Sequence, residues 1–426
     1  MVNRIGVKLK NAIKYLIILM SCIIIGFIMI EIVYLIPNDK MCEHIIESEG
    51  DMLDDSNNRN GTVFVGINYT NPDDYTCSIM LSTALVHADA GVKTALLNPH
   101  HDLGNENGVF HSVVEQAKTI TDGIKDYPQQ NYGRYWHGYL VILKPLLYCF
   151  NYSQIILLNQ IFIICVSVFL INLLGKRFDY KIMITTMILF VILNPFIISI
   201  SFQLSTAYYV LLLTMISLLV FEKRHWTYIF ILSGIMIAFV DFLTYPLIVL
   251  GVPLILALIL QENTDFMGNL KFIIINSVLF VFGYIGMWAG KWVLASFFTS
   301  ENIIIDAIQS VKYRTSGDTM IREKSLFNAM KLTLDMMPKF IVVLLFITAI
   351  IALALAIIKK RGLKEGKVGL RLSIFMVSLY TFIWFGAVMN HTIMHPHLAF
   401  REWAIFIYGV FTMLLLPERT PDCGKK

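Results

Sequence analysis

The stretch AIKYLIILMSCIIIGFIMIEIVYLI, residues 12–36, decides the class of fold. An apolar α-helix needs about 20 residues to cross the hydrocarbon core of a bilayer, and this run is long enough. It follows a basic start with Arg4, Lys8 and Lys10. A signal peptide has a shorter apolar region and a small-residue cleavage site. We therefore predict an uncleaved first transmembrane helix over residues 12–36.

The rest of the chain has the composition of a membrane protein. Of its 426 residues 57% are hydrophobic and 15% are charged, and its mean hydropathy is +0.67, whereas soluble domains are about 25% charged. Further apolar runs lie near 153–175, 182–201, 206–221, 226–242, 246–260, 272–297, 338–358, 372–389 and 403–416. We predict an all-α polytopic membrane protein with about ten transmembrane helices. The short run 138–150 contains Lys144 and Pro145, so we expect a re-entrant or interfacial segment, or an extension of the next helix.

Lysine and arginine collect in the cytoplasmic connectors of membrane proteins. Residues 1–11, alternate connectors and the tail 417–426 hold more than half of the 34 Lys and Arg residues. We therefore predict that both termini are cytoplasmic, with membrane blocks at 138–298 and 338–416. Three of the segments that then lie on the outer side carry most of the ionisable residues, and these are 37–137, 299–337 and the connector 390–402. Two further outer connectors, near 202–205 and 243–245, are short.

The first outer segment is long and acidic, with 15 Asp and Glu against 6 Lys and Arg. We predict short amphipathic, interfacial helices at 77–90 (CSIMLSTALVHADA) and 109–121 (VFHSVVEQAKTIT). Cys42 and Cys77 share this segment, and they fit either a disulfide or two free thiols. The six cysteines show no CxxC pair and no zinc spacing.

Two ionisable side chains lie near the outer ends of predicted helices. Asp241 lies in AFVDFLTYPLIVLG, just before Tyr245, and Lys291 lies in GMWAGKWVLASFF. Ionisable residues within the membrane mark functional sites by default, so Asp241 and Lys291 are candidates. Tyr245, four residues after Asp241, is a third. The alternatives are a helix-end carboxylate that reaches interfacial water and a lysine that extends to the headgroups. Gly286 and Gly290 form a GxxxG step, which favours helix packing.

The connector NHTIMHPHLAFREW, residues 390–403, gathers ionisable residues between two apolar runs. His391 and His395 are four residues apart, a spacing that can bind a metal but is weak evidence without an acidic ligand. His397 follows closely. Arg401 fits a clamp for a phosphate or carboxylate, or an interfacial anchor.

The second outer segment contains a basic cluster in SVKYRTSGDTMIREK. Lys312, Arg314, Arg322 and Lys324 lie close together in the sequence. They fit either a binding site for an anionic headgroup or a solvated charged face.

The first outer segment supplies acids and aromatic rings. In NPDDYT, Asp73 and Asp74 precede a predicted helix, where they fit helix-start residues, a general base or a metal ligand. The segment ends on YGRYWHGYLVILKPLL, whose aromatic and basic residues fit a headgroup or sugar ring or an aromatic belt. The candidates in this motif are Arg134, Tyr135, Trp136 and His137.

Motifs for nucleotide chemistry are missing from the sequence. There is no Walker loop, no GxGxxG that opens a helix and no GxSxG. We therefore expect neither cytoplasmic nucleotide chemistry nor a nucleic-acid partner.

With these segments in view, the chain resembles the glycosyltransferase C superfamily, polytopic transferases that use polyprenyl-phosphate sugars outside the membrane. The resemblance covers the architecture of most of the chain, from the first helix and its long, acidic outer segment to the later outer loops. RYWHGYLVILKPLL, DFLTYPLIVLGVPL, VKYRTSG and NHTIMHPHLAFRE are similar to segments of bacterial membrane proteins of this kind. The resemblance implies a multi-pass protein of the bacterial plasma membrane.

The resemblance also implies roles for particular residues. In that superfamily a carboxylate of the first outer loop acts as general base, and the nearest match, PDDYT, gives Asp73 or Asp74. The motif lies far behind the first helix, after an acidic stretch, which leaves Asp54, Asp55 and Asp102 as alternatives.

Members of the superfamily often bind the lipid phosphate with outer-loop arginine or lysine. The matching positions are Arg401, Arg314 and Lys291. The remaining candidates, from Asp241 and Tyr245 to the motif 134–137 and the three histidines of the connector, would contact substrate. No cofactor is certain, and a divalent metal is an option.

The implied function is transfer of a sugar from a polyprenyl-phosphate donor to a cell-envelope glycan, lipid or protein acceptor. Three other functions fit the same topology. One is a polymerase or ligase of lipid-linked polysaccharide, which needs outer arginines but no carboxylate base. The others are a transporter or flippase of envelope precursors, with Asp241 and Lys291 lining its path, and a non-catalytic scaffold with the acidic segment as its docking surface.

Overall fold

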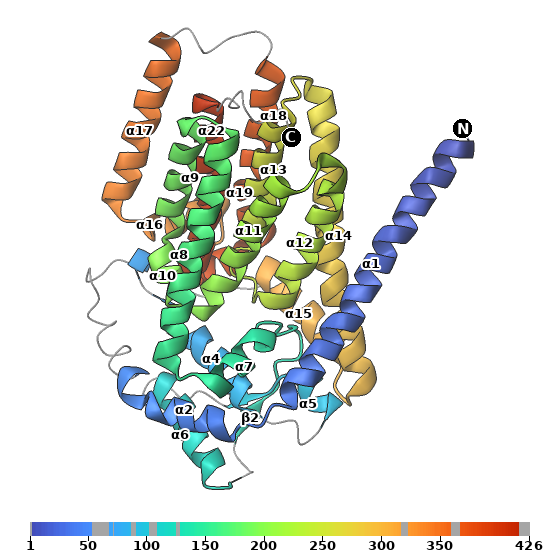
Figure 1. Ribbon diagram of the computed structural model, residues 1–426, viewed down its shortest axis with the longest axis vertical. Coiled ribbons are helices and arrows are strands. Elements are labelled where there is room, and N and C mark those ends of the chain that lie inside the picture. Colours follow the sequence, from blue (N-terminus) through green and yellow to red (C-terminus); the bar gives the residue numbers. More distant parts are fainter. Residues whose placement is uncertain are drawn as a thin grey trace.

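The computed structural model describes residues 2–52, 68–70, 72–86, 91–101, 109–124, 128–316, 323–358 and 367–416. These residues form a bundle of helices with a cap of short elements at one end (Figure 1). Four residues considered above lie outside the described residues, and these are Asp54, Asp55, Asp102 and Arg322.

The cap is built from the first outer segment and follows helix α1 (Val2–Tyr34). Its helices from this segment are α2 (Asp39–Glu47), η1 (Asn68–Thr70), α4 (Asp74–Leu85), α5 (Val92–Leu97) and α6 (Val109–Thr121). Strands β1 (His100–His101) and β2 (Gln129–Gln130) pair antiparallel within it. The run 138–150 forms a separate short helix, α7 (Leu140–Cys149), which packs against α2 and α4 of the cap. Figure 1 shows α1 descending from the far end of the bundle to this cap.

The bundle contains the longer helices and the connectors between them. In chain order these are α8 (Tyr152–Arg177), α9 (Tyr180–Leu193), α10 (Pro195–Ser199), α11 (Phe202–Val220), η2 (Lys223–His225), α12 (Trp226–Val240), α13 (Ile248–Gln261), α14 (Phe266–Phe298), α15 (Ile303–Ser316), α16 (Leu326–Asp335), α17 (Lys339–Ile358), α18 (Val368–Ser378), α19 (Tyr380–Ala387), α20 (Met389–Met394), α21 (Pro396–Ala399), η5 (Phe400–Glu402) and α22 (Trp403–Leu415).

The apolar helices confirm a helical membrane protein but not the predicted number of spans. Among the described residues, six helices are long and apolar enough to cross a bilayer, or seven if α16 and α17, bent by 104°, form one span. The run predicted at 182–201 divides into α9 and α10, because Asn194 adopts a left-handed conformation with φ 55° between them. Helices α12 and α13 have 15 and 14 residues. The count of about ten is therefore not confirmed.

The cap helices match the sequence prediction in different degrees. Helix α6 spans the predicted residues 109–121 and has an exposed side. The predicted helix 77–90 is α4, which begins earlier, at Asp74, and ends at Leu85. Residues 77–85 are all buried, so this helix is not amphipathic in the sense expected of a surface helix. Cys42 and Cys77 are free thiols and both are buried.

Glycines let neighbouring helices approach closely. A Cβ atom on Gly286 would come within 2.4 Å of Leu19, and one on Gly290 within 2.6 Å of Ile23. The GxxxG step of α14 therefore packs against α1, as the spacing predicts. On the other side of α14, a Cβ on Gly283 would meet the carbonyl oxygen of Ile231 in α12 at 2.4 Å.

Candidate functional site

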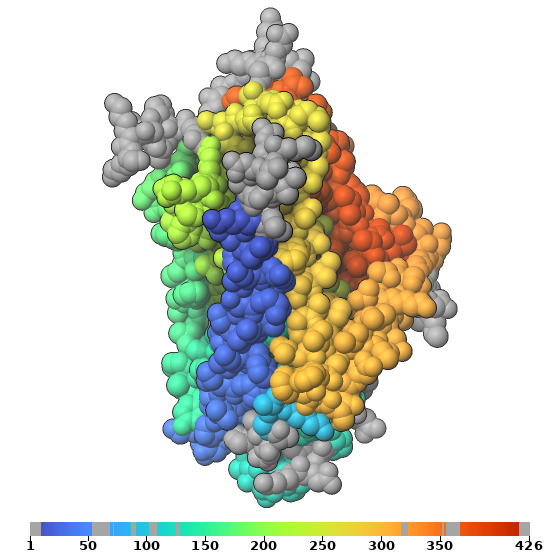
Figure 2. All heavy atoms as spheres, turned by 90° about the vertical axis from the view of Figure 1, so that its right-hand side faces the viewer, coloured from blue at the N-terminus to red at the C-terminus, as the bar shows by residue number. Residues whose placement is uncertain are grey.

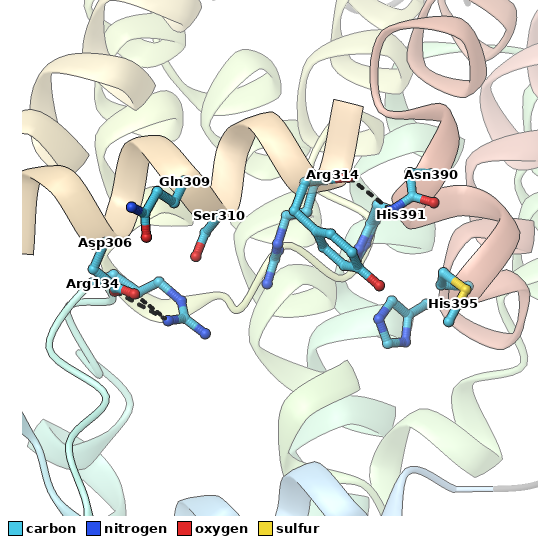
Figure 3. A pocket seen from close by; sticks show the side chains of 10 residues that line it. Arg134, Asp306, Gln309, Ser310, Arg314, Asn390, His391 and His395 are labelled. Carbon is cyan, nitrogen blue, oxygen red and sulfur yellow. Dashed lines mark hydrogen bonds and ion pairs between the residues drawn. The ribbon is translucent and has the colours of Figure 1, made fainter. Parts of the chain in front are cut away.

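A polar cavity opens where the three predicted outer segments meet (Figure 3). Its volume is about 360 Å³, which is within the range of small-ligand sites. Arg134 comes from the first outer segment, and the other lining residues belong to α15 and to residues 390–395. These are Asp306, Gln309, Ser310, Tyr313, Arg314, Asn390, His391, Met394 and His395. The amide of Asn390 donates to the carbonyl oxygen of Tyr313 at 2.7 Å, which joins the second and third segments.

Arg134 is fixed in the cavity wall by an ion pair. Its Nη1 donates to Oδ2 of Asp306 at 3.1 Å. The guanidinium lies 4.8 Å from the ring centroid of Tyr132 and 5.8 Å from that of Tyr135, distances that favour cation–π attraction. Its Nε is buried without a hydrogen-bond partner. One donor of a well-positioned guanidinium is therefore not used by the protein.

Arg314 faces the same cavity from α15 (Figure 3). Its Nη1 is buried and has no hydrogen-bond partner among the described residues, and its guanidinium carbon lies 5.7 Å from the ring centroid of Tyr135. Arg134 and Arg314 face a single lining carboxylate, that of Asp306, so with neutral histidines the lining has a net positive charge. Guanidinium groups with unused donors favour an anionic ligand such as phosphate.

Three histidines lead from the cavity toward Arg401. The ring centroids of His391 and His395 are 4.9 Å apart, and those of His395 and His397 are 5.9 Å apart. Burial holds the pKa of the His391 imidazole well below its usual value. Burial, together with the charges of His397 and Arg314, lowers the pKa of His395 to about 4. Both rings are therefore neutral near pH 7 in the free protein.

The histidines do not complete a metal site. Nε2 of His391 lies 2.9 Å from the carbonyl oxygen of Leu243, to which it donates. In the described part of the chain, no group of three or more His, Cys, Asp or Glu is arranged to hold a metal ion. A divalent metal remains a prediction for which we identify no set of ligands.

Asp73 reaches this region from the first outer segment. It is the N-cap of α4, where its Oδ1 accepts a hydrogen bond from the backbone N–H of Thr76 at 3.1 Å. The half-buried carboxylate lies close enough to His395, His397 and Arg401 to interact with each electrostatically. The candidate base and a candidate phosphate ligand are thus neighbours.

Arg401 is held by its own connector and by aromatic rings. It is buried, and its Nη1 donates to the carbonyl oxygen of His397 at 2.9 Å. The guanidinium lies 4.5 Å from the ring centroid of Phe400 and 5.7 Å from that of Tyr245. The hydroxyl of Tyr245 donates to the carbonyl oxygen of Leu204. This bond fixes the position of the ring that lies beside Arg401. Nε of Arg401 has no hydrogen-bond partner.

No family model, curated protein or solved structure matches this chain. The resemblance to the glycosyltransferase C superfamily therefore stays a prediction. Function has to be inferred from the chemistry of the side chains around the cavity, because an all-helical membrane bundle does not by itself specify a reaction.

Lys291 lies in a different environment from the cavity arginines. Its Nζ donates to Oδ1 of Asn98 at 2.7 Å and to the carbonyl oxygen of Ala95 at 3.4 Å. It lies 5.6 Å from the ring centroid of Trp136 and interacts electrostatically with Glu31 of α1. Lys291 does not line the cavity. We call this group the α5 anchor, because it attaches the C-terminal end of α5 to α14.

The other residues predicted around Arg134 contribute to the wall rather than to the lining of the cavity. The ring of Tyr135 packs against Tyr132 at 5.1 Å between centroids. Trp136 is buried and its Nε1 donates to the carbonyl oxygen of Met287 in α14 at 2.7 Å. Nε2 of His137 lies 3.0 Å from the carbonyl oxygen of Tyr132. These bonds fix the segment that carries Arg134.

Asp241 and Asp74, like Asp73, are not among the residues that line the cavity. Asp241 is buried at the end of α12, where its Oδ2 accepts from the backbone N–H of Thr244 at 2.9 Å and its Oδ1 accepts from the Thr244 hydroxyl. Asp74 lies in the first turn of α4, where its negative charge interacts favourably with the helix dipole. Asp74 therefore fits the predicted helix-start role, whereas Asp241 is a buried helix-end carboxylate bonded to Thr244 and does not reach water as its structural alternative had it.

Three polar residues that matter in the structure were not predicted from the sequence. Asp306 and Asn390 line the cavity. Glu402 is buried beside Arg401, with Oε1 accepting from the backbone N–H of Leu247 at 2.9 Å and Oε2 without a partner. The sequence did contain a signal for Glu402, because it is an acidic residue next to Arg401 in an otherwise apolar stretch. Asp306 gave no such signal, because its partner Arg134 is 172 positions away.

Proposed function

We propose that this protein is an integral membrane glycosyltransferase. It moves a sugar from a polyprenyl-phosphate donor to a cell-envelope glycan, lipid or protein acceptor, on the side of the membrane that bears the cap. Asp73 is the general base, and arginines around the cavity bind the donor phosphate.

The observation that carries the proposal is the convergence of three segments on one region. Asp73 belongs to the first outer segment, Arg314 to the second, and His395 and Arg401 to the connector 390–402. Arg314 and His395 line the cavity, and Asp73, which does not line it, interacts electrostatically with His395 and Arg401. A carboxylate, Asp73, in the same region as the guanidinium groups of Arg314 and Arg401 suits a reaction that needs one general base and one binding site for an anion.

The chemistry requires few groups. The carboxylate of Asp73 takes the proton of an acceptor hydroxyl as the oxygen attacks the anomeric carbon of the sugar. The bond between this carbon and the phosphate oxygen breaks, and its electron pair leaves with the lipid phosphate. The charge that grows on the phosphate is stabilised by the guanidinium of Arg314 in the cavity lining and by the charge of Arg401.

The test separates binding from transfer. Asp73→Asn keeps the helix cap, because asparagine caps as well as aspartate, but removes the base. With a panel of labelled polyprenyl-phosphate sugars, we expect transfer to fall by about 10²–10⁴-fold, while binding of a polyprenyl phosphate stays within about twofold. Arg401→Gln is expected to weaken that binding by about tenfold or more, because charge-assisted hydrogen bonds are lost. Undiminished transfer by Asp73→Asn, or no binding of polyprenyl phosphate by the unmodified protein, would contradict the proposal.

A polymerase or ligase of lipid-linked polysaccharide is the second candidate. It is favoured by the use of Asp73 Oδ1 as a helix cap and by the neutral His395 in the cavity lining. In this case the histidine replaces the carboxylate as base. Transfer that is retained in Asp73→Asn and lost in His395→Gln would assign the base to His395 and so favour this second function.

A further inference from the structure

Helix α15 has two faces of opposite character. Asp306 and Arg314, on one face, line the cavity. Ile304, Ile308 and Val311 are exposed, and their i, i+4, i+7 spacing places them on one side of the helix. At 3.6 residues per turn this side is opposite to the cavity face. The described residues leave this apolar side exposed.

The position of α15 in the chain indicates what covers this face. Helix α14 is a candidate membrane span, and its last turns expose Val293 and Phe297, the latter at 78%. Only residues 299–302 separate α14 from α15. In Figure 2 the surfaces of α14 and the segment that follows it are continuous in the lower half of the view, from yellow to orange. Helix α15 therefore begins at the depth where a span leaves the hydrocarbon core.

The charge on the exposed face fits the same environment. Lys312 is exposed and lies one turn after Ile308, on the apolar side. A lysine at the edge of an apolar stripe keeps its stem with the apolar residues and extends its ammonium to lipid phosphates. In water, by contrast, the uncovered isoleucines would be unfavourable by about 25 cal/mol per Å².

We propose that α15 is an interfacial helix that lies in the headgroup–acyl boundary of the leaflet beside the cap. Its Ile304–Ile308–Val311 face contacts lipid, and its opposite face forms a wall of the cavity. The cavity is thereby held at the depth of the lipid headgroups. This inference does not depend on the reaction proposed above.

The test is photo-crosslinking of the full-length chain in discs of phosphatidylcholine alone, so that no lipid-linked sugar contributes. A benzoyl-phenylalanine replaces Ile308, and in separate proteins Ser310, which lines the cavity two residues later. Val278, exposed in the middle of α14, is the lipid reference. Glu115, exposed on cap helix α6, is the aqueous reference. Mass spectrometry measures the fraction of each protein that carries a lipid adduct.

We expect the yield at position 308 to be within about twofold of that at 278, and at least about fivefold above those at 115 and 310. Ile305, exposed beside this face, serves as a second position in case the change at 308 prevents folding, and it should behave in the same way. A yield at the folded position, 308 or 305, equal to that at 115 or at 310 would overturn the proposal.

Discussion

Arg314 and Lys291 are both cations near the capped end of the bundle, yet their surroundings differ. Nη1 of Arg314 is buried without a hydrogen-bond partner beside a cavity. The ammonium of Lys291 donates to Asn98 and Ala95 and lies over Trp136. The sequence alone suggested phosphate binding for both. The difference teaches that a buried arginine or lysine is a candidate for phosphate binding only where its N–H donors are not already bonded within the protein.

The largest expected effect is on ligand binding by Arg314. Arg314→Gln removes a charged donor from the cavity, and hydrogen bonds to charged groups are worth about 1.5–3 kcal/mol. We expect the affinity for a polyprenyl phosphate to fall by about 10–100-fold, with little change in thermal stability in detergent. Lys312→Gln, on the other side of the same helix, is the matched control and should bind normally. Equal losses in both variants would mean that bulk charge, and not the cavity, attracts the lipid.

The α5 anchor should show the opposite behaviour. Lys291→Met keeps the length of the side chain but leaves Oδ1 of Asn98 and the carboxylate of Glu31 without their cation. We expect the free energy of unfolding to fall by about 1–3 kcal/mol, while the folded fraction binds polyprenyl phosphate with nearly normal affinity. Lys271→Met, at an exposed position near the other end of α14, is the control. A stable Lys291→Met protein that no longer binds lipid phosphate would reverse the assignment of the two cations.

A smaller effect is expected from pH. In the free protein the pKa of His395 is about 4. The ligand for this measurement is a polyprenyl-phosphate sugar, a phosphate diester whose charge does not change between about pH 5 and 7 and which favours the protonated ring when bound. The complex then holds more protons than the free protein, so the affinity rises as the pH falls. We expect a gain of about threefold between about pH 7 and pH 5, measured by binding isotherms, and a flat profile for His395→Gln. A gain that persists in His395→Gln would place the titrating group elsewhere.

The smallest effect concerns the ion pair in the cavity wall. Asp306→Asn releases Arg134 and removes the carboxylate that lines the cavity. Because the charge stands beside the proposed phosphate site, we expect the affinity to rise by about two- to fivefold. A weaker affinity would show that Asp306 is needed to position Arg134, and the cavity would then depend on this pair for its shape.

The sequence predicted elements well where local signals decide the structure. The helix at 109–121 was found with its observed bounds because turn-rich residues flank an amphipathic pattern. Helix α4 begins at Asp74 because Asp73 caps it, and the same carboxylate had been considered as a base. The number of spans was not predictable in this way. The backbone turn at Asn194 divides one apolar run into two helices, and a hydropathy pattern does not register such a break.

The cavity was predictable in part. The basic and histidine-rich motifs of the last two outer segments do meet, because α15 packs on α20. Partners that are far apart in sequence were not foreseen, and these include the Arg134–Asp306 pair and the attachment of Lys291 to Asn98. Only the tertiary fold distinguishes Arg314, whose Nη1 has no partner among the described residues, from Lys291, which donates to Asn98 and Ala95.

The most direct test is a cryo-electron microscopy map of the protein in lipid discs with a polyprenyl phosphate. The account predicts phosphate density in the cavity, within hydrogen-bond distance of Arg314 and beside His395. Phosphate density next to Lys291 and α5, or on the opposite side of the membrane, would contradict it.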